Sequence, residues 1–440
     1  MPEFTSQATA IPTIDRYLER YAEPEAISLP DQRLKQFDSV IVIPVYDESE
    51  QALQRFLEFD NGRHTLLIWV FNTPESAVGK PAHLRTCKVL QYFLSKLNSR
   101  KVSERCFLSQ VNASLELLIV DRCSCPIPDK QGVGLARKIG ADLALLLSYR
   151  QYLHSGQLIP WLYSTDADVI LPQNYAMLAP PERAVAACVH PFAHRLENGY
   201  EQAMRQYEFS LHYYVDQLSY AGSPYAFHTI GSLLACTPLA YAQVRGFPKR
   251  AGAEDFYLLN KLAKVGRVET LADPVLQVAG RPSHRVPFGT GPALIKINAQ
   301  AAQARPFQVY HPRIFTLLKA VLASVSNIEN SIAQTSLPLF ARRDTILQTQ
   351  EQLAVIKVLD KLGWQKQSDH MRQLGTPEAK QSAFHTWFDA FLTLRFVHEL
   401  RDQLYPNINL AELPVLLDED AFSGACIDYI AWFKKLGISA

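Results

Sequence analysis

Three continuous runs of apolar and β-branched residues constrain the fold of this chain more than any other feature. They cover residues 39–45 (SVIVIPV), 65–72 (TLLIWVFN) and 115–121 (LELLIVD). Runs without polar alternation are typical of strands that are buried on both faces, as in parallel sheets. Helical patterns follow the second run at 83–97 and the third at 134–153. Strands alternating with helices predict an α/β fold, a mainly parallel, Rossmann-like sheet flanked by helices.

The second half of the chain has a different pattern. Beyond about residue 310 the sequence shows no strand signal, and two helices are expected at 344–364 and 376–404, the second with Thr376 as its N-cap. A chain of 440 residues is long for one hydrophobic core, so two domains are expected. The expected division is an N-terminal helical extension over 1–36, a catalytic α/β domain over 37–305 and a helical C-terminal region over 306–440.

The composition indicates which binding partners and which cellular compartment to expect. The chain has 44 Lys plus Arg against 43 Asp plus Glu, so no global positive field favours nucleic acid. Seven scattered cysteines, with Cys123 and Cys125 as C-x-C and not C-x-x-C, are typical of reduced thiols. No signal-peptide pattern opens the sequence, and no run approaches the roughly 20 apolar residues of a membrane span. We expect a cytoplasmic protein without a transmembrane segment, with the C-terminal helices available for a homo-oligomer.

Carboxylates follow the ends of several predicted strands. Asp47 and Glu48 come after the first strand, the third ends at Asp121, and a strand from Trp161 runs into Asp166 and Asp168. Carboxyl ends of parallel strands meet at one edge, where ligands bind. Like charges there repel unless a cation or hydrogen-bond donors intervene, and hard oxygen ligands suit Mg²⁺ or Mn²⁺ bound to phosphates. Asp47 and Asp121 could instead accept hydrogen bonds from a nucleobase and a ribose.

A second acidic pair opens a predicted helix. Glu254 and Asp255 follow a loop that contains Gly246 and Gly252. Carboxylates at a helix N-terminus commonly complement the helix dipole, and that structural interpretation stays open. In a chain with strand-end carboxylates, the alternative is a general base.

Five short motifs occur in one order over about residues 37–290. They are Pro44-x-Tyr46-x-Glu48, Asp121, Ala136-Arg137-Lys138-x-Gly140, Asp166-x-Asp168, and Gly246-Phe247 with Glu254-Asp255. Together they resemble the GT-A glycosyltransferases of family 2, which transfer a hexose or related sugar from a nucleotide-diphospho-sugar to a hydroxyl acceptor. Two departures are Lys138, where the family has Asn, and the absence of the Gln-x-x-Arg-Trp motif of processive members.

The resemblance implies a role for each matching residue. Asp255, supported by Glu254, would be the general base of an inverting transfer. Asp168 would bind Mg²⁺ or Mn²⁺, with the downstream His284 as a further ligand. Arg281 and Arg285 would contact phosphate, or would be surface charges. Donor contacts would come from Pro44, Tyr46, Asp47, Glu48, Asp121, Arg137, Lys138 and Asp166.

Two other functions fit parts of the sequence. The segment Asp166 to Ile170 also resembles the first motif of haloacid-dehalogenase-type phosphatases, with Asp166 as a phosphoryl nucleophile. A GT-A-like module that binds nucleotide sugars without turnover is a non-enzymatic alternative. The sugar-transfer interpretation would fail if Asp168 lay far from Asp121 and Asp255, or were neutralised by an arginine in a closed pocket.

Overall fold

The structure, a computed structural model, describes residues 7–31, 36–182, 184–282, 289–325 and 349–416. The chain forms two compact units, Met1–Leu196 with Thr229–Gly289, and Glu197–His228 with Thr290–Ala440. The expected division differs in three respects. The N-terminal extension belongs to the first unit, and the segments 197–228 and 290–305, both expected inside the catalytic domain, belong to the second.

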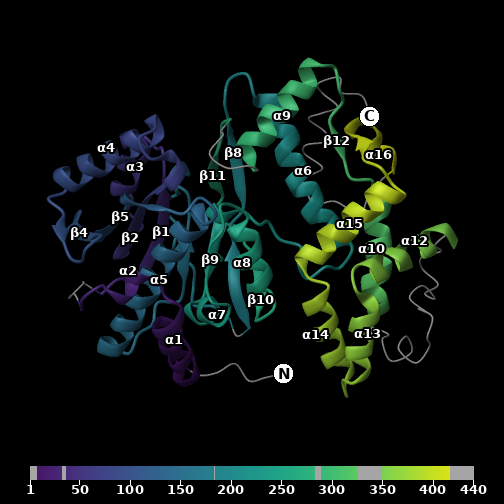
Figure 1. Ribbon diagram of the computed structural model, residues 1–440, viewed down its shortest axis with the longest axis horizontal. Coiled ribbons are helices and arrows are strands. Elements are labelled where there is room, and N and C mark those ends of the chain that lie inside the picture. Colours follow the sequence, from purple (N-terminus) through teal and green to yellow (C-terminus); the bar gives the residue numbers. More distant parts are fainter. Residues whose placement is uncertain (1–6, 32–35, 183, 283–288, 326–348, 417–440) are drawn as a thin grey trace. The chain divides into compact units, whose positions relative to one another are not determined.

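The described part of the first unit contains a nine-stranded sheet (Figure 1). Two strands, β9 and β4, run antiparallel to their neighbours, and the other seven share one direction. The prediction of a mainly parallel sheet flanked by helices is confirmed. In spatial order the strands are β10 (Arg267–Thr270), β7 (Val185–Val189), β9 (Leu234–Cys236), β6 (Leu162–Ser164), β1 (Ser39–Val45), β2 (Thr65–Pro74), β5 (Leu115–Ile127), β4 (Cys106–Gln110) and β3 (Arg100–Lys101).

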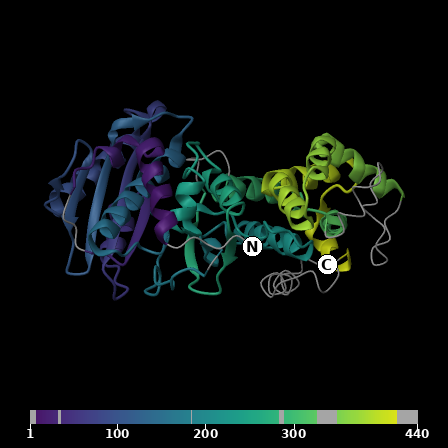
Figure 2. The same ribbon diagram turned by 90° about the horizontal axis from the view of Figure 1, so that it is seen from below.

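Helices cover both faces of the sheet's centre, where β1, β2 and β5 lie side by side (Figures 1 and 2). On β2, Trp69 packs edge-on against Phe93 of α4 (Pro81–Lys96). Its neighbour Val70 lies next to Gly140 of α5 (Gly132–Ser155), where an added Cβ would clash with Val42 at 2.3 Å. Successive strand residues point to opposite faces, so α4 and α5 cover opposite faces. Because helices cover both faces, the side chains on both sides of the central strands are buried, which explains their continuous apolar sequence.

The first unit contains further strands and helices besides these. Strands β8 (Phe192–Leu196) and β11 (Leu276–Gly280) form a separate parallel pair. The helices are α1 (Gln7–Tyr21), α2 (Pro24–Ile27), α3 (Glu50–Leu57), η1 (Glu75–Ala77), η2 (Gly231–Leu233), α7 (Pro238–Gln243) and α8 (Glu254–Leu262).

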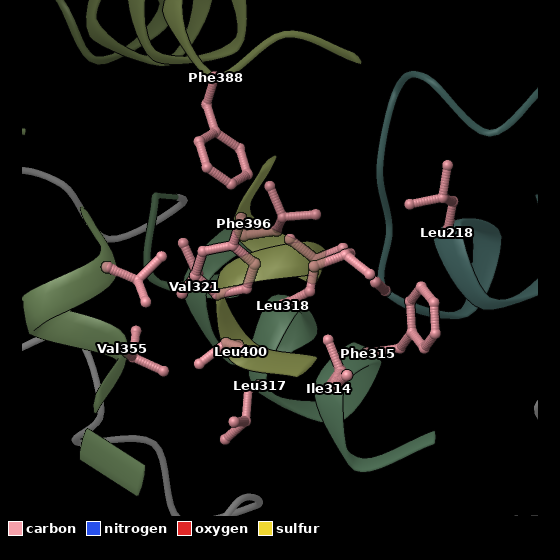
Figure 3. Close-up of a cluster of buried hydrophobic side chains, with 14 of the residues drawn as sticks. Leu218, Ile314, Phe315, Leu317, Leu318, Val321, Val355, Phe388, Phe396 and Leu400 are labelled. Atoms are coloured by element: carbon pink, nitrogen blue, oxygen red, sulfur yellow. The ribbon is translucent and has the colours of Figure 1, made fainter. Parts of the chain in front are cut away.

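The second unit is helical, with a large apolar core and a smaller apolar cluster of Ala203, Met204, Leu294 and Ile297 between α6 and α9. Figure 3 shows Phe396 and Leu400 of α15 meeting Leu317, Leu318 and Val321 of α10 at the centre of the large core. Its helices are α6 (Glu201–Tyr220), α9 (Thr290–Ala302), α10 (Pro312–Val325), α12 (Thr349–Lys361), α13 (Trp364–Arg372), α14 (Pro377–Trp387), α15 (Ala390–Gln403), η3 (Leu410–Glu412) and α16 (Leu413–Leu416). The helical C-terminal region is confirmed for the described residues, with one short antiparallel pair, β12 (Gln308–Val309) and β13 (Ile408–Asn409), added.

One helix prediction in this unit was wrong in its length. The segment expected as a single helix over 376–404 is two helices, α14 and α15. Thr376 caps α14, as predicted, by accepting a hydrogen bond from the Ala379 N–H at 3.2 Å. Asp389 caps α15 by accepting from Phe391 and Leu392 N–H groups, both at 3.1 Å. A helix that starts here has backbone N–H groups without intrahelical acceptors. The Asp389 side chain accepts from two of them, so the chain can turn between α14 and α15.

Across the described ranges, no helix is both long enough and apolar enough to cross a lipid bilayer.

Candidate active site

The loop before α8 packs against the start of α5 and brings two sequence motifs together. Gly134 donates its backbone N–H to the Arg250 carbonyl oxygen at 2.9 Å. A Cβ at Gly134 would lie 2.5 Å from the Pro248 carbonyl oxygen, so this close approach requires glycine. One turn further along α5, the Arg137 side chain therefore reaches Glu254, the first residue of α8.

Arg137 links the end of β6 to the start of α8. Its Nε donates to Glu254 Oε1 at 2.9 Å, Nη2 to Asp166 Oδ1 at 2.5 Å, and Nη1 to Ser164 Oγ at 2.8 Å. We name Arg137, Asp166 and Glu254 the Arg137 cluster. Arg137 and Glu254 are buried, whereas the Asp166 side chain is 37% exposed. A buried carboxylate needs such a partner, and the pair orients Asp166 at the accessible side.

The environment of Arg137 differs from the one that the resemblance implies. Burial opposes its charge, but Asp166, Glu254 and Asp255 raise the pKa of Arg137 above its ordinary value. Each of its three nitrogens donates to a protein acceptor. Arg137 therefore acts as an internal link, and its direct contact with a donor diphosphate stays a prediction.

Asp255 lies beside this cluster in the first turn of α8. Ala253, directly before the helix, has φ 58°, in the left-handed region that non-glycine residues rarely adopt. Burial and the neighbouring Glu254 carboxylate raise the pKa of Asp255 to about 7, against the lowering effect of Arg137. The Phe256 N–H donates to Asp255 Oδ1 at 2.7 Å. A carboxylate with a pKa near neutrality is suited to accept a proton from a hydroxyl group.

A second cluster joins the end of β1 to the segment after β6. Arg281 Nη2 donates to both carboxylate oxygens of Glu48, at 2.7 and 2.9 Å, and to Asp168 Oδ2 at 3.2 Å. We name these three residues the Arg281 cluster. An arginine does pair with Asp168, but the side chains of Arg281 and Asp168 are 35% and 20% exposed. The pair is therefore open to solvent, not enclosed in the closed pocket that would exclude a sugar-transfer site.

The residues next to Glu48 form a separate arrangement. Pro44 is buried in β1, and Tyr46 is partly exposed. Asp47 has φ 55° and receives two hydrogen bonds from Arg85 of α4, at 2.7 and 3.0 Å. Its backbone N–H donates to Thr86 Oγ1 at 2.9 Å. Residues of α4 therefore contact both the side chain and the backbone N–H of Asp47, whose backbone lies in the left-handed region.

Asp121 stabilises an irregularity within β5, not the end of the strand. The sequence predicts that this strand ends at Asp121, but β5 continues to Ile127 with a register shift after Arg122. Asp121 accepts hydrogen bonds from the N–H groups of Cys123 and Ser124, at 2.9 and 3.0 Å. The side chain thus satisfies backbone donors that the bulge removes from the ladder. Its contact with a nucleoside stays a prediction.

Lys138 is buried on the side of α5 that packs against α1. Its ammonium donates to Tyr17 Oη at 2.6 Å and to Asp142 Oδ2 at 2.9 Å. Asp142 is fully buried and also accepts from Tyr241 Oη at 2.8 Å. These bonds hold α1 and α7 on α5, and they explain why the N-terminal segment belongs to the first unit. Lys138 is thus a buried structural charge paired with Asp142, and we leave it out of the donor site proposed below.

The described carboxylates do not fit a resident Mg²⁺ or Mn²⁺. Arg281 already pairs with Asp168 Oδ2 and with both oxygens of Glu48. In the parts of the chain that the structure describes, no three His, Cys, Asp or Glu side chains gather as metal ligands would. The predicted further ligand His284, and Arg285, lie outside the described residues. Metal binding therefore stays a prediction, and the arrangement of the described carboxylates does not support it.

Sequence reasoning missed two basic residues near the Arg281 cluster. Arg195, in β8, donates from Nη2 to the Asp168 carbonyl oxygen at 3.1 Å. Burial and the charge of Arg195 lower the pKa of Arg55, in α3, while Asp168 and Glu48 raise it. Neither arginine belongs to a motif: Arg55 lies in α3, directly after the Glu48 segment, and Arg195 is 27 residues from Asp168. The local pattern carries no signal that would have identified them.

Comparisons with known proteins give weak similarity. No family model matches the chain, and no curated protein matches it in sequence. Among solved structures, the mannosyltransferase PcManGT from Pyrobaculum calidifontis, in complex with GDP-Man and Mn²⁺, has 16% identity and a TM-score of 0.33, covering 86% of this chain and 96% of its own. S. aureus TarS 1–349 in complex with UDP-GlcNAc has 12% identity and a TM-score of 0.34, covering 83% and 92%. At these TM-scores the similarity is too low to assign a family or a residue's role.

Proposed function

We propose that this protein transfers a sugar from a nucleoside-diphosphate sugar to a hydroxyl acceptor, with Asp255 as the general base. The observation that carries the proposal is the position and pKa of Asp255. It lies beside Asp166 and Arg137, where the end of β6 meets the first turn of α8, and its pKa is raised to about 7. The order of the five motifs in the sequence supports the same function.

The proposed reaction is a single displacement. Asp255 accepts the proton of the acceptor hydroxyl, whose oxygen forms the new bond to the anomeric carbon. The bond from that carbon to the phosphate oxygen breaks, and its electron pair leaves with the nucleoside diphosphate. A base contributes typically 10²–10⁴-fold to such a step, and a pKa near the working pH serves it best. One displacement from the opposite face inverts the anomeric configuration.

The Arg137 cluster would hold the donor sugar. Asp166 is the exposed member, and Arg137 fixes one of its oxygens. Carboxylates held in this way accept hydrogen bonds from sugar hydroxyls with little loss of side-chain entropy. Glu254, bound to the same arginine, sets the position of the first turn of α8 and hence of Asp255. Asp47, Asp121 and Tyr46 are the proposed nucleoside contacts.

Substitution of Asp255 tests this proposal. Purified protein is incubated with a panel of uridine and guanosine diphosphate sugars and hydroxyl acceptors, and release of nucleoside diphosphate is measured. Asp255→Asn should lower transfer by about 10²–10⁴-fold while donor binding, measured by calorimetry, persists. The control Asp369→Asn replaces an exposed acid on α13 and should leave transfer unchanged. Transfer by Asp255→Asn near the parent rate would refute the base assignment.

Product stereochemistry provides an independent test. The anomeric configuration of the initial product, determined by NMR, should be opposite to that of the donor. Retention of configuration would exclude the single displacement, even if glycosyl transfer itself were established.

A further inference from the structure

One arginine contacts the two carboxylates of the Arg281 cluster, and two further arginines lie nearby. Arg281 pairs with both Glu48 and Asp168, and Arg195 donates to the Asp168 backbone. Arg55 interacts electrostatically with Arg195, Asp168 and Glu48. The three come from α3, from β8 and from the segment after β11. Three positive charges against two negative charges leave this group of five residues with a net charge of +1.

One N–H group of Arg281 donates to no acceptor among the described residues. Its Nη2 makes the hydrogen bonds to Glu48 and Asp168, whereas its Nε is buried and has no hydrogen-bond partner among the described residues. A buried N–H of a charged group without an acceptor is costly, and native structures usually provide one. The side chain also remains 35% exposed, so a ligand can approach it. An anion with several oxygens that approaches the exposed part of this side chain would balance the excess charge.

We propose that Arg281, with Arg55 and Arg195, binds the diphosphate of the donor directly, so that donor binding needs no divalent cation. The inference rests on the proposed function, because the diphosphate is assigned to this edge of the sheet by the glycosyl-transfer reaction. Guanidinium groups bind phosphate oxygens with two parallel hydrogen bonds and stay charged at every physiological pH. Glu48 and Asp168 then serve as positioning residues that hold Arg281.

The same residues are poorly arranged for a metal ion. A divalent cation at Asp168 would lie close to the Arg281 guanidinium, whose Nη2 is 3.2 Å from Asp168 Oδ2. Like charges at that distance repel unless one group moves away. Arginine already supplies the positive charge that the strand-end carboxylates require. When the bond between the anomeric carbon and the phosphate oxygen breaks, the arginines would stabilise the added negative charge on the leaving diphosphate.

Binding of nucleoside diphosphates tests the inference without measuring turnover. The full chain is titrated with UDP and with GDP by calorimetry, once in excess EDTA and once with Mn²⁺ or Mg²⁺. The dissociation constant of the preferred nucleotide should differ by less than about threefold between the two conditions. Binding only in the presence of the metal would overturn the inference while leaving glycosyl transfer intact. Failure of both nucleotides to bind under either condition would remove the proposed function as well.

Variants assign the binding to the arginines. In EDTA, Arg281→Gln should weaken nucleotide binding by about tenfold or more, and Arg281→Lys should weaken it less because a charge remains. Arg267→Gln, which removes an exposed arginine of β10, is the matched control and should bind as the parent does. Equal binding by Arg281→Gln and Arg267→Gln in EDTA would contradict the assignment. The titrations of the parent chain in EDTA and in metal use no variant. The inference can therefore be refuted even if a variant misfolds.

Discussion

The Arg137 and Arg281 clusters both place one arginine between two carboxylates, but they differ in what surrounds them. Arg137 is buried, and each of its nitrogens donates to a protein acceptor. Arg281 is 35% exposed, its Nε lacks a described partner, and two further arginines lie nearby. The first arrangement is complete without a ligand and suits the support of a reactive group. The second has unused donors and excess charge, which suit the binding of an anion.

The largest expected difference between the clusters is in stability. Arg137→Gln would leave the Glu254 carboxylate buried without its partner, and we expect a loss of about 3–5 kcal/mol in the free energy of unfolding. Arg281→Gln also leaves a carboxylate that is only 5% exposed, Glu48, but Arg281 itself is 35% exposed, so water can replace part of its contact and we expect a smaller loss of about 1–2 kcal/mol. Urea unfolding of both variants provides the measurement. Equal losses would show that the two clusters do not differ in the way that their burial indicates.

A methyl group placed against Arg137 tests the rigidity of the buried cluster. A Cβ at Gly231 would lie 2.6 Å from Arg137 Nη2, and the bonds of that arginine prevent it from moving aside. Gly231→Ala should therefore destabilise the protein by about 1–3 kcal/mol. Gly375→Ala is the control, since nothing lies within 4 Å of an added Cβ there. An unchanged unfolding midpoint for Gly231→Ala would mean that the cluster adapts.

The raised pKa of Asp255 predicts a dependence of stability on pH. The pKa of an unfolded Asp is about 3.9, so between about pH 4 and pH 7 the folded chain holds a proton that the unfolded chain has released. Stability contributed by this group therefore falls as the pH rises through that window. Asp255→Asn should remove the slope and stabilise the protein at pH 8 by roughly 1–2 kcal/mol. Thermal unfolding across this range measures it, and destabilisation at pH 8 would show that Arg137 dominates the environment of Asp255.

The smallest effect is expected at the exposed pair of Asp47 and Arg85. The Arg85 side chain is 60% exposed, and exposed ion pairs contribute little to stability. Arg85→Gln should leave the unfolding midpoint within measurement error in a thermal scan. A clear drop would indicate that Arg85 maintains the left-handed backbone of Asp47, and so contributes to the shape of the open edge.

Local pattern predicted much of the architecture. The apolar runs correspond to β1, β2 and the first part of β5, the predicted start of α8 at Glu254 is confirmed, and Thr376 caps α14. These features depend on residues close in sequence, whose spacing records burial and capping directly. The break at Asp389 was missed because the apolar spacing continues through it, although Asp is itself a common N-cap.

The sequence by itself determined which residues would be buried in strands, where several helices begin, and that carboxylates would gather at one edge of a parallel sheet. Only the tertiary structure decided which cation neutralises each carboxylate. Arg137 is 117 residues from Glu254, and Arg281 is 233 residues from Glu48. Such pairs depend on the order of strands in the sheet and on close approaches such as that of Gly134 to Arg250, and neither leaves a periodic trace in the chain. Charge pairing is fixed by distance in space, whereas sequence pattern reports only distance along the backbone.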